Sequence, residues 1–297
     1  MSIVISAIII NYNAGTFLPK SVDSLRNCSL EIEIIVIDNA STDGSLDSLA
    51  GLPNIQIVKN PLNVGFAKAC NRGASIASAP LLLFLNPDCS FSEGTLSTLV
   101  EVMRTKENVG MAGGLLVNTD GTEQAGGRRA IPTPWRSFVR AFGLSKLSQR
   151  WPRLFYDFHL HQEALPDEPL EVEAISGACM LVRRKAIEDV GLWDEGYFLH
   201  CEDLDWCMRF RQKGWKILFV PDAIIVHEHG GCSRNRPIFV EWHKHKGMMR
   251  FYNKFFRHQY PGLLMVLVAM GVWLRFGLIA IYHTGLNLVD KLRFKNG

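Results

Sequence analysis

The sequence has few cysteines and no Cys-x-x-Cys pair. Its seven cysteines, an odd number, are scattered along 297 residues. Disulfide frameworks and structural zinc sites depend on closely spaced pairs of cysteines, so the sequence argues against both kinds of site. The pattern predicts reduced thiols in a cytosolic compartment.

Low-complexity runs and fixed-period repeats are absent, which excludes disordered and solenoid proteins. No basic segment precedes the apolar run at residues 3–10, so we expect no secretory signal, and this run is too short to cross a bilayer. With 47% hydrophobic and 21% charged residues, the chain can bury the core of one large or two small domains.

Charge is distributed unevenly. The segment from Arg234 to the end holds 11 Lys and Arg against 2 Asp and Glu, a net charge of +9, which leaves −6 on residues 1–233 of the total +3. A basic end on an acidic body predicts a surface that meets phosphates or anionic lipid. We expect no nucleic-acid partner.

Apolar runs that each end in a polar loop predict four buried strands, at residues 3–10, 32–37, 55–58 and 81–85. We expect one helix from Phe17, between the first two runs, and another with Asn63 as its N-cap, between the last two. The order β-α-β-β-α-β predicts an α/β fold with a mostly parallel sheet. The run at 81–85 is apolar throughout, which is typical of a strand buried on both faces.

Amides and carboxylates stand where three of these strands end: Asn11, Asn13, Asp38, Asn39, Asn86 and Asp88. Open α/β sheets bind ligands at the carboxyl edge of their parallel strands. There Asp38 could accept a hydrogen bond from a ribose hydroxyl or a base, and Asp88 could hold a divalent cation against a phosphate. The alternative for Asp88 is an ordinary Asn-Pro-Asp turn.

The segment at residues 63–73 places Lys68 and Arg72 one helical turn apart, within reach of a diphosphate. Gly65 would let a ligand approach the backbone N–H groups at the start of this helix. The alternative is a solvated helix face.

Together these segments resemble the nucleotide-sugar-binding half of family-two glycosyltransferases. The motifs concerned occur in order at residues 8–13, 36–45, 63–73 and 85–88. Within the family, their sequences are most similar to those of bacterial rhamnosyltransferases of cell-surface polysaccharide synthesis. The resemblance implies a GT-A fold, Mg²⁺ or Mn²⁺ as cofactor, and Asp88 as the metal-holding end of the Asp-x-Asp motif. Asn86 replaces the first Asp of that motif, so metal binding depends more heavily on Asp88. The donor-binding residues that it implies are Asn11, Asn13, Asp38, Asn39, Lys68, Asn71, Asn86 and Asp88.

Residues 124–156 contain no acidic residue but many arginines and aromatics. If residues 135–144 are helical, Trp135, Phe138, Val139 and Phe142 share one face, which is typical of an interfacial helix or a site for a lipid diphosphate. The alternative is a loop whose aromatic side chains pack on the domain.

Three acids, Glu202, Asp203 and Asp205, cluster at the start of a predicted helix that ends before Gly214. The helix dipole explains one or two of them without a function. Glycosyl transfer needs a base that takes the proton of the acceptor hydroxyl. The Glu202-Asp203 pair resembles the family's Glu-Asp motif, which implies that Asp203 is the base. We expect Glu202 and Asp205 to orient the base or contact the acceptor, and Trp206 to contact the acceptor.

The remaining patterns predict a helix from near Glu93, a strand at residues 110–117 with a hairpin after it, a strand at 173–182, a helix at 183–191 and two strands at 217–220 and 223–226. By resemblance, His227 completes the metal site, and His229 is a weaker alternative because its spacing is one residue off. Ser233 could bind the leaving diphosphate.

Residues 261–282 are apolar and just long enough to span a bilayer, but Arg275 interrupts them. We expect a membrane-embedded or surface-lying helix pair with both ends in the cytosol, or else a single crossing. The alternative is a face that packs on the catalytic domain or on a second subunit.

We therefore expect a GT-A glycosyltransferase with a nucleotide-sugar-binding half at 1–118, an acceptor-binding and catalytic half at 119–233, and a membrane-associating tail at 234–297. The resemblance implies an inverting enzyme at the cytoplasmic face of the inner membrane. Its donor would be dTDP-rhamnose and its acceptor a saccharide or a polyprenyl-diphosphate-linked saccharide; a homo-oligomer stays open. The alternatives are a sugar-nucleotide pyrophosphorylase, which would need a Gly-rich loop after the first strand, and an inactive scaffold of a polysaccharide assembly complex.

Overall fold

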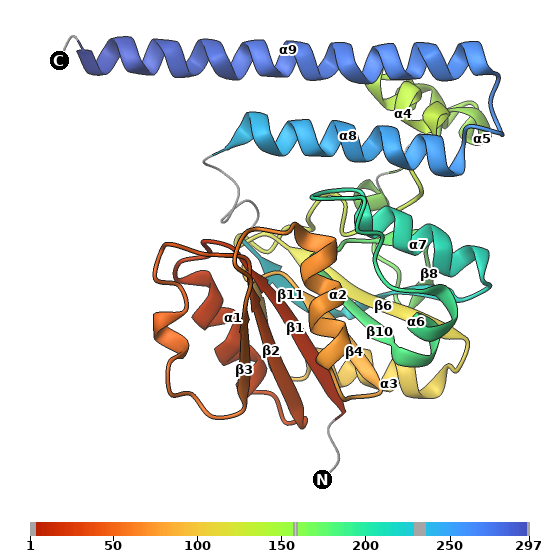
Figure 1. Ribbon diagram of the computed structural model, residues 1–297. Coiled ribbons are helices and arrows are strands. Elements are labelled where there is room, and N and C mark those ends of the chain that lie inside the picture. The colour runs from red at the N-terminus through yellow and green to blue at the C-terminus, as the bar shows by residue number, and fades with distance from the viewer. Residues whose placement is uncertain (1–3, 157, 159, 229–235, 296–297) are drawn as a thin grey trace.

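The computed structural model describes residues 4–156, 158, 160–228 and 236–295, and one nine-stranded sheet forms its core (Figure 1). The strand order is β3-β2-β1-β4-β10-β6-β11-β5, and β8 also pairs with β11. The strands are β1 Ile5–Asn11, β2 Ile32–Asp38, β3 Ile55–Lys59, β4 Leu81–Leu85, β5 Cys89–Phe91, β6 Val109–Val117, β8 Leu170–Glu171, β10 Cys179–Arg183 and β11 Lys216–His227. A separate two-stranded sheet pairs β7 Arg128–Arg129 with β9 Ala174–Ile175.

The first half of the sheet is parallel, as the sequence predicts. β1 pairs in parallel with both β2 and β4, and β2 pairs in parallel with β3. Side chains of β1 alternate between two cores, since Ile8 and Ile10 pack on one face while Ile5 and Ile9 pack on the other. The helices that cover these faces are α1 Phe17–Arg26, α2 Phe66–Ile76, α3 Thr95–Thr105, α6 Arg184–Val190 and α7 Glu202–Gln212.

The second half of the sheet is mixed, because β10 runs antiparallel to β4 and β6 while β11 runs parallel to β6. The prediction of two strands at 217–220 and 223–226 is wrong: a bulge between Val220 and Ile224 keeps β11 continuous. Gly114 stands opposite this bulge, where a Cβ atom would lie 2.0 Å from the carbonyl oxygen of Ala223.

Other boundaries also differ from the prediction. Gly65, at φ 88°, is the N-cap of α2, while the Oδ1 atom of Asn63 accepts a hydrogen bond from the Gly65 backbone N–H at 2.9 Å. α3 starts at Thr95 rather than near Glu93. The predicted strand at 173–182 is divided into β9 and β10 by residues 176–178.

Short helices lie in the chain between β7 and β9: α4 Pro134–Ala141, η2 Leu144–Gln149, α5 Pro152–Phe155 and η3 Leu160–Gln162, with η1 Asp47–Leu49 earlier in the chain. α4 confirms part of the predicted helix, but Val139 is fully buried while Trp135, Phe138 and Phe142 are 43–68% exposed. The three rings are therefore exposed beside a buried Val139.

Two long helices, α8 Pro237–Phe255 and α9 Gly262–Lys295, lie side by side above the sheet, with α4 and α5 beside the end of α8 and the start of α9 (Figure 1). The rings of Trp242 and Trp273 join them, with their centroids 5.2 Å apart. The apolar segment predicted at residues 261–282 lies almost entirely within one helix, α9. Its segment Gly262–Leu286 is long and apolar enough to cross a membrane, and only 6% of its apolar stretch is buried against the rest of the protein.

Candidate active site

The ends of β1 and β2 hold a buried polar cluster around Asn11. Its side-chain amide donates hydrogen bonds to Asp38 Oδ1 at 2.8 Å, to Ser45 Oγ at 2.9 Å and to Ser41 Oγ at 3.0 Å. Asp38 is 3% exposed, and its Oδ2 atom accepts from the Ser41 backbone N–H at 3.2 Å. Asn11 thus fixes the Asp38 carboxylate at the carboxyl edge of the sheet.

The loops beside this cluster are held by two further amides. Asn13 accepts at its Oδ1 atom from the Thr42 backbone N–H at 2.8 Å. Asn39 is buried and receives a hydrogen bond at 2.7 Å from Asn60. These contacts position the loops after β1 and β2, so both amides have a structural role whether or not they touch a ligand.

Asp88 and His227 face each other at the end of β4 and β11. The antiparallel pairing of β5 with β11 places Cys89 opposite His227, and His227 Nε2 lies 3.2 Å from Asp88 Oδ1. Both side chains are buried. Among the described residues, Asp88, Cys89 and His227 form the group whose ligand atoms lie close enough together to hold a metal ion.

Gln124 sets the tautomer of the neutral His227 ring. Its side-chain amide donates to Asn118 Oδ1 and to the His227 carbonyl, so its Oε1 atom faces His227 Nδ1 at 2.6 Å as an acceptor. Nδ1 therefore bears the proton in the neutral ring, and Nε2 presents a lone pair toward Asp88. Two acceptors 3.2 Å apart repel unless a proton or a cation lies between them. The Cys89 thiol donates instead to the Ala178 carbonyl at 3.5 Å, which leaves an oxygen and a nitrogen for the ion.

The predicted base Asp203 lies in the first turn of α7 and is 15% exposed at its side chain. Its Oδ2 atom accepts hydrogen bonds from Arg129 and from the Gly177 backbone N–H, the latter at 3.1 Å. Burial disfavours the charge of Arg129, but the Asp203 carboxylate beside it raises the pKa of Arg129 above its ordinary value. A Cβ atom on Gly177 would lie 3.2 Å from Asp203 Cβ, so glycine permits this close approach.

The same loop joins Asp203 to the carboxyl edge of the sheet. The Asn86 backbone N–H donates to the Ala178 carbonyl at 2.8 Å, and the neighbouring Gly177 binds Asp203. Asp38 stands two strands away from the end of β4, about 10 Å at the usual strand spacing. Asp38, Asp88 and Asp203 therefore lie along one edge of one sheet.

Glu202 is the most strongly perturbed acid of this site. Glu202 is 6% exposed, and its Oε2 atom has no hydrogen-bond partner among the residues that the structure describes. Burial, together with the charge of Asp203, raises the pKa of Glu202 to about 8. The raised pKa thus belongs to Glu202, while Asp203 is paired with Arg129.

The predicted acceptor contacts of Asp205 and Trp206 are not available in this structure. Asp205 is fully buried and binds Arg209, Tyr197 and Lys254. Trp206 is fully buried among aromatic rings, including Trp193 at 4.2 Å between centroids, and donates to the Gly191 carbonyl. Both residues are part of the core beneath the site.

Two predicted donor contacts lie elsewhere on α2. The Asn71 amide binds the Trp193 backbone and Glu195 Oε1, which ties α2 to the loop before α7. Lys68 is exposed, and Arg72 binds Asn60 and the Lys59 carbonyl. His229 and Ser233, which the sequence marks as a second metal ligand and a diphosphate contact, lie outside the described residues.

Helix α8 packs tightly on the segment that leads into the base. His200 and Cys201 both have positive φ angles, 68° and 69°, which costs energy for residues other than glycine. A Cβ atom on Gly247 of α8 would lie 2.6 Å from the His200 carbonyl oxygen. Lys254 of α8 also bridges Asp194 and Asp205, at 2.7 and 2.6 Å. α8 therefore helps to hold the start of α7 in place.

Arg129, Gln124 and the α8 contacts are the site residues that sequence reasoning misses. Arg129 belongs to the basic segment assigned to lipid, and no spacing signals a partner 74 residues away. Gln124 comes shortly after the predicted hairpin turn, and that turn is the sequence signal that could have placed Gln124 near the end of the preceding strand.

The model of glycosyl transferase family 2 matches residues 6–191, more than half of the chain. The chain belongs to glycosyl transferase family 2. A second model, glycosyl transferase family group 2, matches residues 129–288 of this family 2 glycosyltransferase.

Curated relatives of this glycosyltransferase include bacterial rhamnosyltransferases. It is 29% identical over 250 residues to N-acetylglucosaminyl-diphospho-decaprenol L-rhamnosyltransferase of Mycobacterium tuberculosis, which covers 80% of each chain. It is 24% identical over 258 residues to rhamnosyltransferase WbbL of Escherichia coli, covering 80% of this chain and 88% of WbbL. It is 24% identical over 262 residues to dTDP-rhamnosyl transferase RfbF of Shigella flexneri, covering 84% and 76%.

Solved structures show the fold. Mannosyltransferase PcManGT from Pyrobaculum calidifontis, in complex with GDP-Man and Mn²⁺, matches with a TM-score of 0.57 at 14% identity, over 96% of this chain and 79% of that one. GalNAc-T7 with UDP, GalNAc and Mn²⁺ also matches with a TM-score of 0.57, at 21% identity, over 76% of this chain but 44% of the length of GalNAc-T7. The predicted GT-A fold is confirmed.

Proposed function

We propose that this glycosyltransferase moves rhamnose from dTDP-rhamnose to a saccharide or lipid-linked saccharide by a single inverting displacement. The observation behind this proposal is the alignment of Asp38, Asp88 and Asp203 along one edge of one sheet, which brings donor-binding, metal-binding and proton-accepting groups together. The rhamnosyltransferase relatives support the choice of sugar.

In this proposal Asp203 accepts the proton of the acceptor hydroxyl as that oxygen attacks the anomeric carbon. Its Oδ2 atom already receives two hydrogen bonds, while Oδ1 accepts only from the Leu204 backbone N–H, so Oδ1 has capacity for a further proton. Arg129 and Gly177 orient the carboxylate. Glu202, neutral near pH 7 because of its raised pKa, adds no second negative charge beside the base.

Asp38 would bind the nucleoside and the amide of Asn86 the ribose or the sugar. Asp88 Oδ1 and His227 Nε2 fit a divalent cation, because Gln124 leaves the Nε2 lone pair facing the carboxylate. Mg²⁺ or Mn²⁺ bound there would stabilise the negative charge of the departing nucleoside diphosphate. An oxygen and a nitrogen ligand suit Mn²⁺ at least as well as Mg²⁺, which prefers oxygen alone.

Within the chain, residues 1–118 would bind the donor, 119–233 would supply the acceptor-binding and catalytic groups, and 234–297 would associate with the cytoplasmic face of the inner membrane. The exposed apolar segment Gly262–Leu286 supports the last assignment. Its 25 residues would extend about 37 Å as a helix, longer than the ~30 Å apolar thickness of a bilayer.

Replacement of Asp203 by Asn tests the proposal. Turnover should fall by about 10²–10⁴-fold, the range expected for loss of general-base catalysis, while donor affinity changes by no more than a few-fold. Asp222→Asn, at an exposed position of β11, is the matched control and should retain full activity. Release of nucleotide from a panel of activated sugars, with Mg²⁺ or Mn²⁺ present, measures both turnover and donor choice.

Near-normal turnover of the Asp203→Asn variant would contradict the assignment of the base. If no donor released its nucleotide, the result would favour the hypothesis of an inactive scaffold. That hypothesis is based on Asn86, which lacks the negative charge of the Asp that it replaces.

A further inference from the structure

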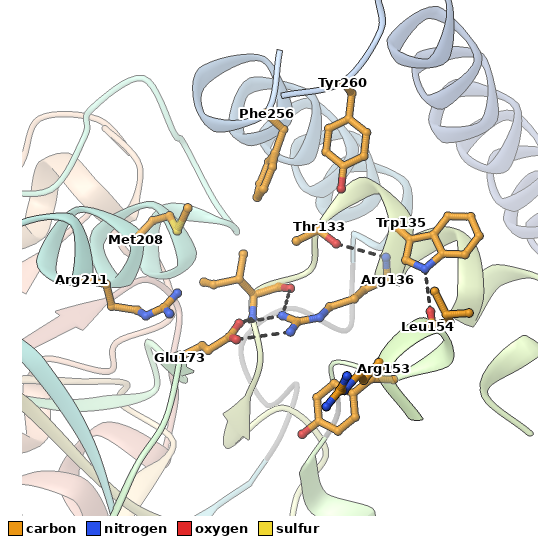
Figure 2. Close-up of a pocket in the computed structure, with 12 residues that line it drawn as sticks. Thr133, Trp135, Arg136, Arg153, Leu154, Glu173, Met208, Arg211, Phe256 and Tyr260 are labelled. Carbon is orange, nitrogen blue, oxygen red and sulfur yellow. Dashed lines mark hydrogen bonds and ion pairs between the residues drawn. The ribbon is translucent and has the colours of Figure 1, made fainter. Parts of the chain in front are cut away.

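A cavity of about 490 Å³ lies between α7, the α4–α5 segment and the chain that joins α8 to α9 (Figure 2). Its lining includes Arg136 and Trp135 of α4, Arg153 of α5, Arg211 of α7 and Tyr260. Neither Asp38 nor Asp88 contributes to its walls, so it is separate from the donor edge of the sheet.

The cavity has a positive charge that its own walls do not neutralise. Arg136 is paired with Glu173 through both guanidinium nitrogens, Nη1 at 2.6 Å and Nη2 at 3.3 Å. Burial alone would raise the pKa of Glu173, but hydrogen bonds from Arg136 and the Ile131 backbone N–H lower it, so this wall pair has no net charge. Arg153 and Arg211 form no ion pair with any described residue, which leaves two guanidinium groups at the cavity.

The other walls are apolar and open toward the surface that would meet the membrane. Trp135 and Leu154 line the cavity and are 43% and 56% exposed. The Trp135 indole N–H donates to the Leu154 carbonyl at 2.6 Å, which joins α4 to α5 (Figure 2). Both helices lie beside the start of the apolar helix α9 (Figure 1). Ring contacts through Phe138 and Phe155 join the exposed Phe142 and Trp151 to Trp135, so they extend the same surface. A lipid chain could thus leave the cavity without crossing water.

The cavity lies a short distance from the proposed base. Met208 and Arg211 are five and eight residues beyond Asp203 on α7, about 7.5 and 12 Å along a helix at 1.5 Å per residue. Ile131, in another wall, is two residues after Arg129, which binds Asp203. Measured along α7, the wall residues of the cavity thus begin about 7.5 Å from Asp203, so the cavity and the proposed base share one helix.

We infer that this cavity binds the diphosphate of an isoprenoid-linked saccharide acceptor, with Arg153 and Arg211 as the phosphate contacts, Arg136–Glu173 as a fixed wall and the isoprenoid chain along Trp135 and Leu154. The inference rests on the proposed sugar transfer and names the acceptor class for it. Guanidinium groups suit phosphate oxygens because they donate paired hydrogen bonds. A lipid phosphate and a free diphosphate share this chemistry, so the test has to separate them.

The binding test uses the full chain in detergent with farnesyl diphosphate as the probe, and with excess dTDP and Mn²⁺ to fill the donor site. Affinity should be at least 10-fold weaker for the Arg153→Gln, Arg211→Gln double variant than for the wild type. Arg150→Gln is the matched control, because Arg150 belongs to the same basic segment but does not line the cavity, and it should stay within two-fold. Inorganic diphosphate and farnesol should each bind the wild type more weakly than farnesyl diphosphate.

Kinetics supply an independent measurement. The double variant should raise KM for a lipid-diphosphate-linked acceptor at least 10-fold, with KM for the donor within two-fold and no change for the same saccharide as an alkyl glycoside. Unchanged farnesyl diphosphate binding, or an equal loss in Arg150→Gln, would overturn the inference. A parallel loss of binding to phosphatidylglycerol vesicles would also overturn it, because it would show general attraction to anionic membrane.

The two levels of the proposal fail differently. If the chain transferred no sugar at all, the binding difference between the double variant and Arg150→Gln would still be measured. If the chain transferred sugar but the double variant behaved as wild type with both acceptors, only the cavity assignment would be wrong.

Discussion

Replacement of Glu202 by Gln should make the protein more stable at alkaline pH. The pKa of Glu202 is raised from an ordinary 4.5 to about 8 by burial, with Asp203 adding to the effect. Between these two values the folded state binds more protons than the unfolded state, so stability falls as the pH rises. Gln has the shape of the protonated acid and bears no charge at any pH.

The size of the effect follows from the shift. Each unit of pKa corresponds to about 1.36 kcal/mol. Relative to low pH, the raised pKa of Glu202 therefore lowers the free energy of unfolding of the wild type by about 1.4 kcal/mol at pH 5.5 and by at most about 5 kcal/mol above pH 8. The stability difference between Glu202→Gln and the wild type should therefore grow by about 3 kcal/mol between pH 5.5 and pH 8.5, or by less if water relaxes around the charge.

Urea unfolding followed by tryptophan fluorescence, at fixed detergent and salt, measures this difference at pH 5.5, 7 and 8.5. Glu188→Gln is the matched control, because Glu188 is exposed on α6, and its effect should not vary with pH. A Glu202→Gln effect that is the same at all three pH values would refute the claim that Glu202 is buried without charge.

Three further predictions concern packing, metal binding and the tail. Gly73→Ala should destabilise the protein by about 1–3 kcal/mol in urea unfolding, because the new Cβ would lie 2.3 Å from Ile8 Cγ2, whereas Ser75→Ala on the same helix should be nearly neutral. Gln124→Ala should weaken Mn²⁺ binding about 10–100-fold by calorimetry, because His227 loses the acceptor that directs its Nε2 lone pair, and an unchanged affinity would place the ion elsewhere. Deletion of residues 259–297 should release the protein from the membrane fraction on cell fractionation, and a truncated protein that still pellets would show that another surface binds the membrane.

The sequence predicts the carboxyl edge of the parallel strands well, because the ends of neighbouring parallel strands meet at the same edge of a sheet. A buried run that ends in an acid puts that acid at the edge of the sheet, and this places Asp38 and Asp88 correctly without any knowledge of distant contacts. His227 lies opposite Cys89 because β5 pairs with β11, a contact between distant parts of the chain that local sequence patterns do not reveal. The sequence places His227 beside Asp88 only through the family resemblance.

The catalytic half is less predictable, because an acidic cluster in a helix does not reveal which acid faces solvent. Glu202, Asp203 and Asp205 lie within one turn, yet their surroundings differ. Glu202 is buried and its Oε2 atom has no hydrogen-bond partner among the described residues, Asp203 is bound to Arg129, and Asp205 is fully buried beside Lys254. Trp206 looks like an acceptor platform in sequence but is a core residue, since it fills the space between α7 and the sheet.

The contact between Gly247 and His200 has a mechanical consequence. α8 has no room to shift toward the left-handed pair His200–Cys201 without displacing it, and Asp203 follows that pair by two residues. Because α8 is joined to α9 by a short turn, the depth at which α9 rests in a bilayer would fix the height of the base above the lipid headgroups. Bilayer thickness would then act on turnover, with thinner or thicker lipids changing kcat before they change donor affinity.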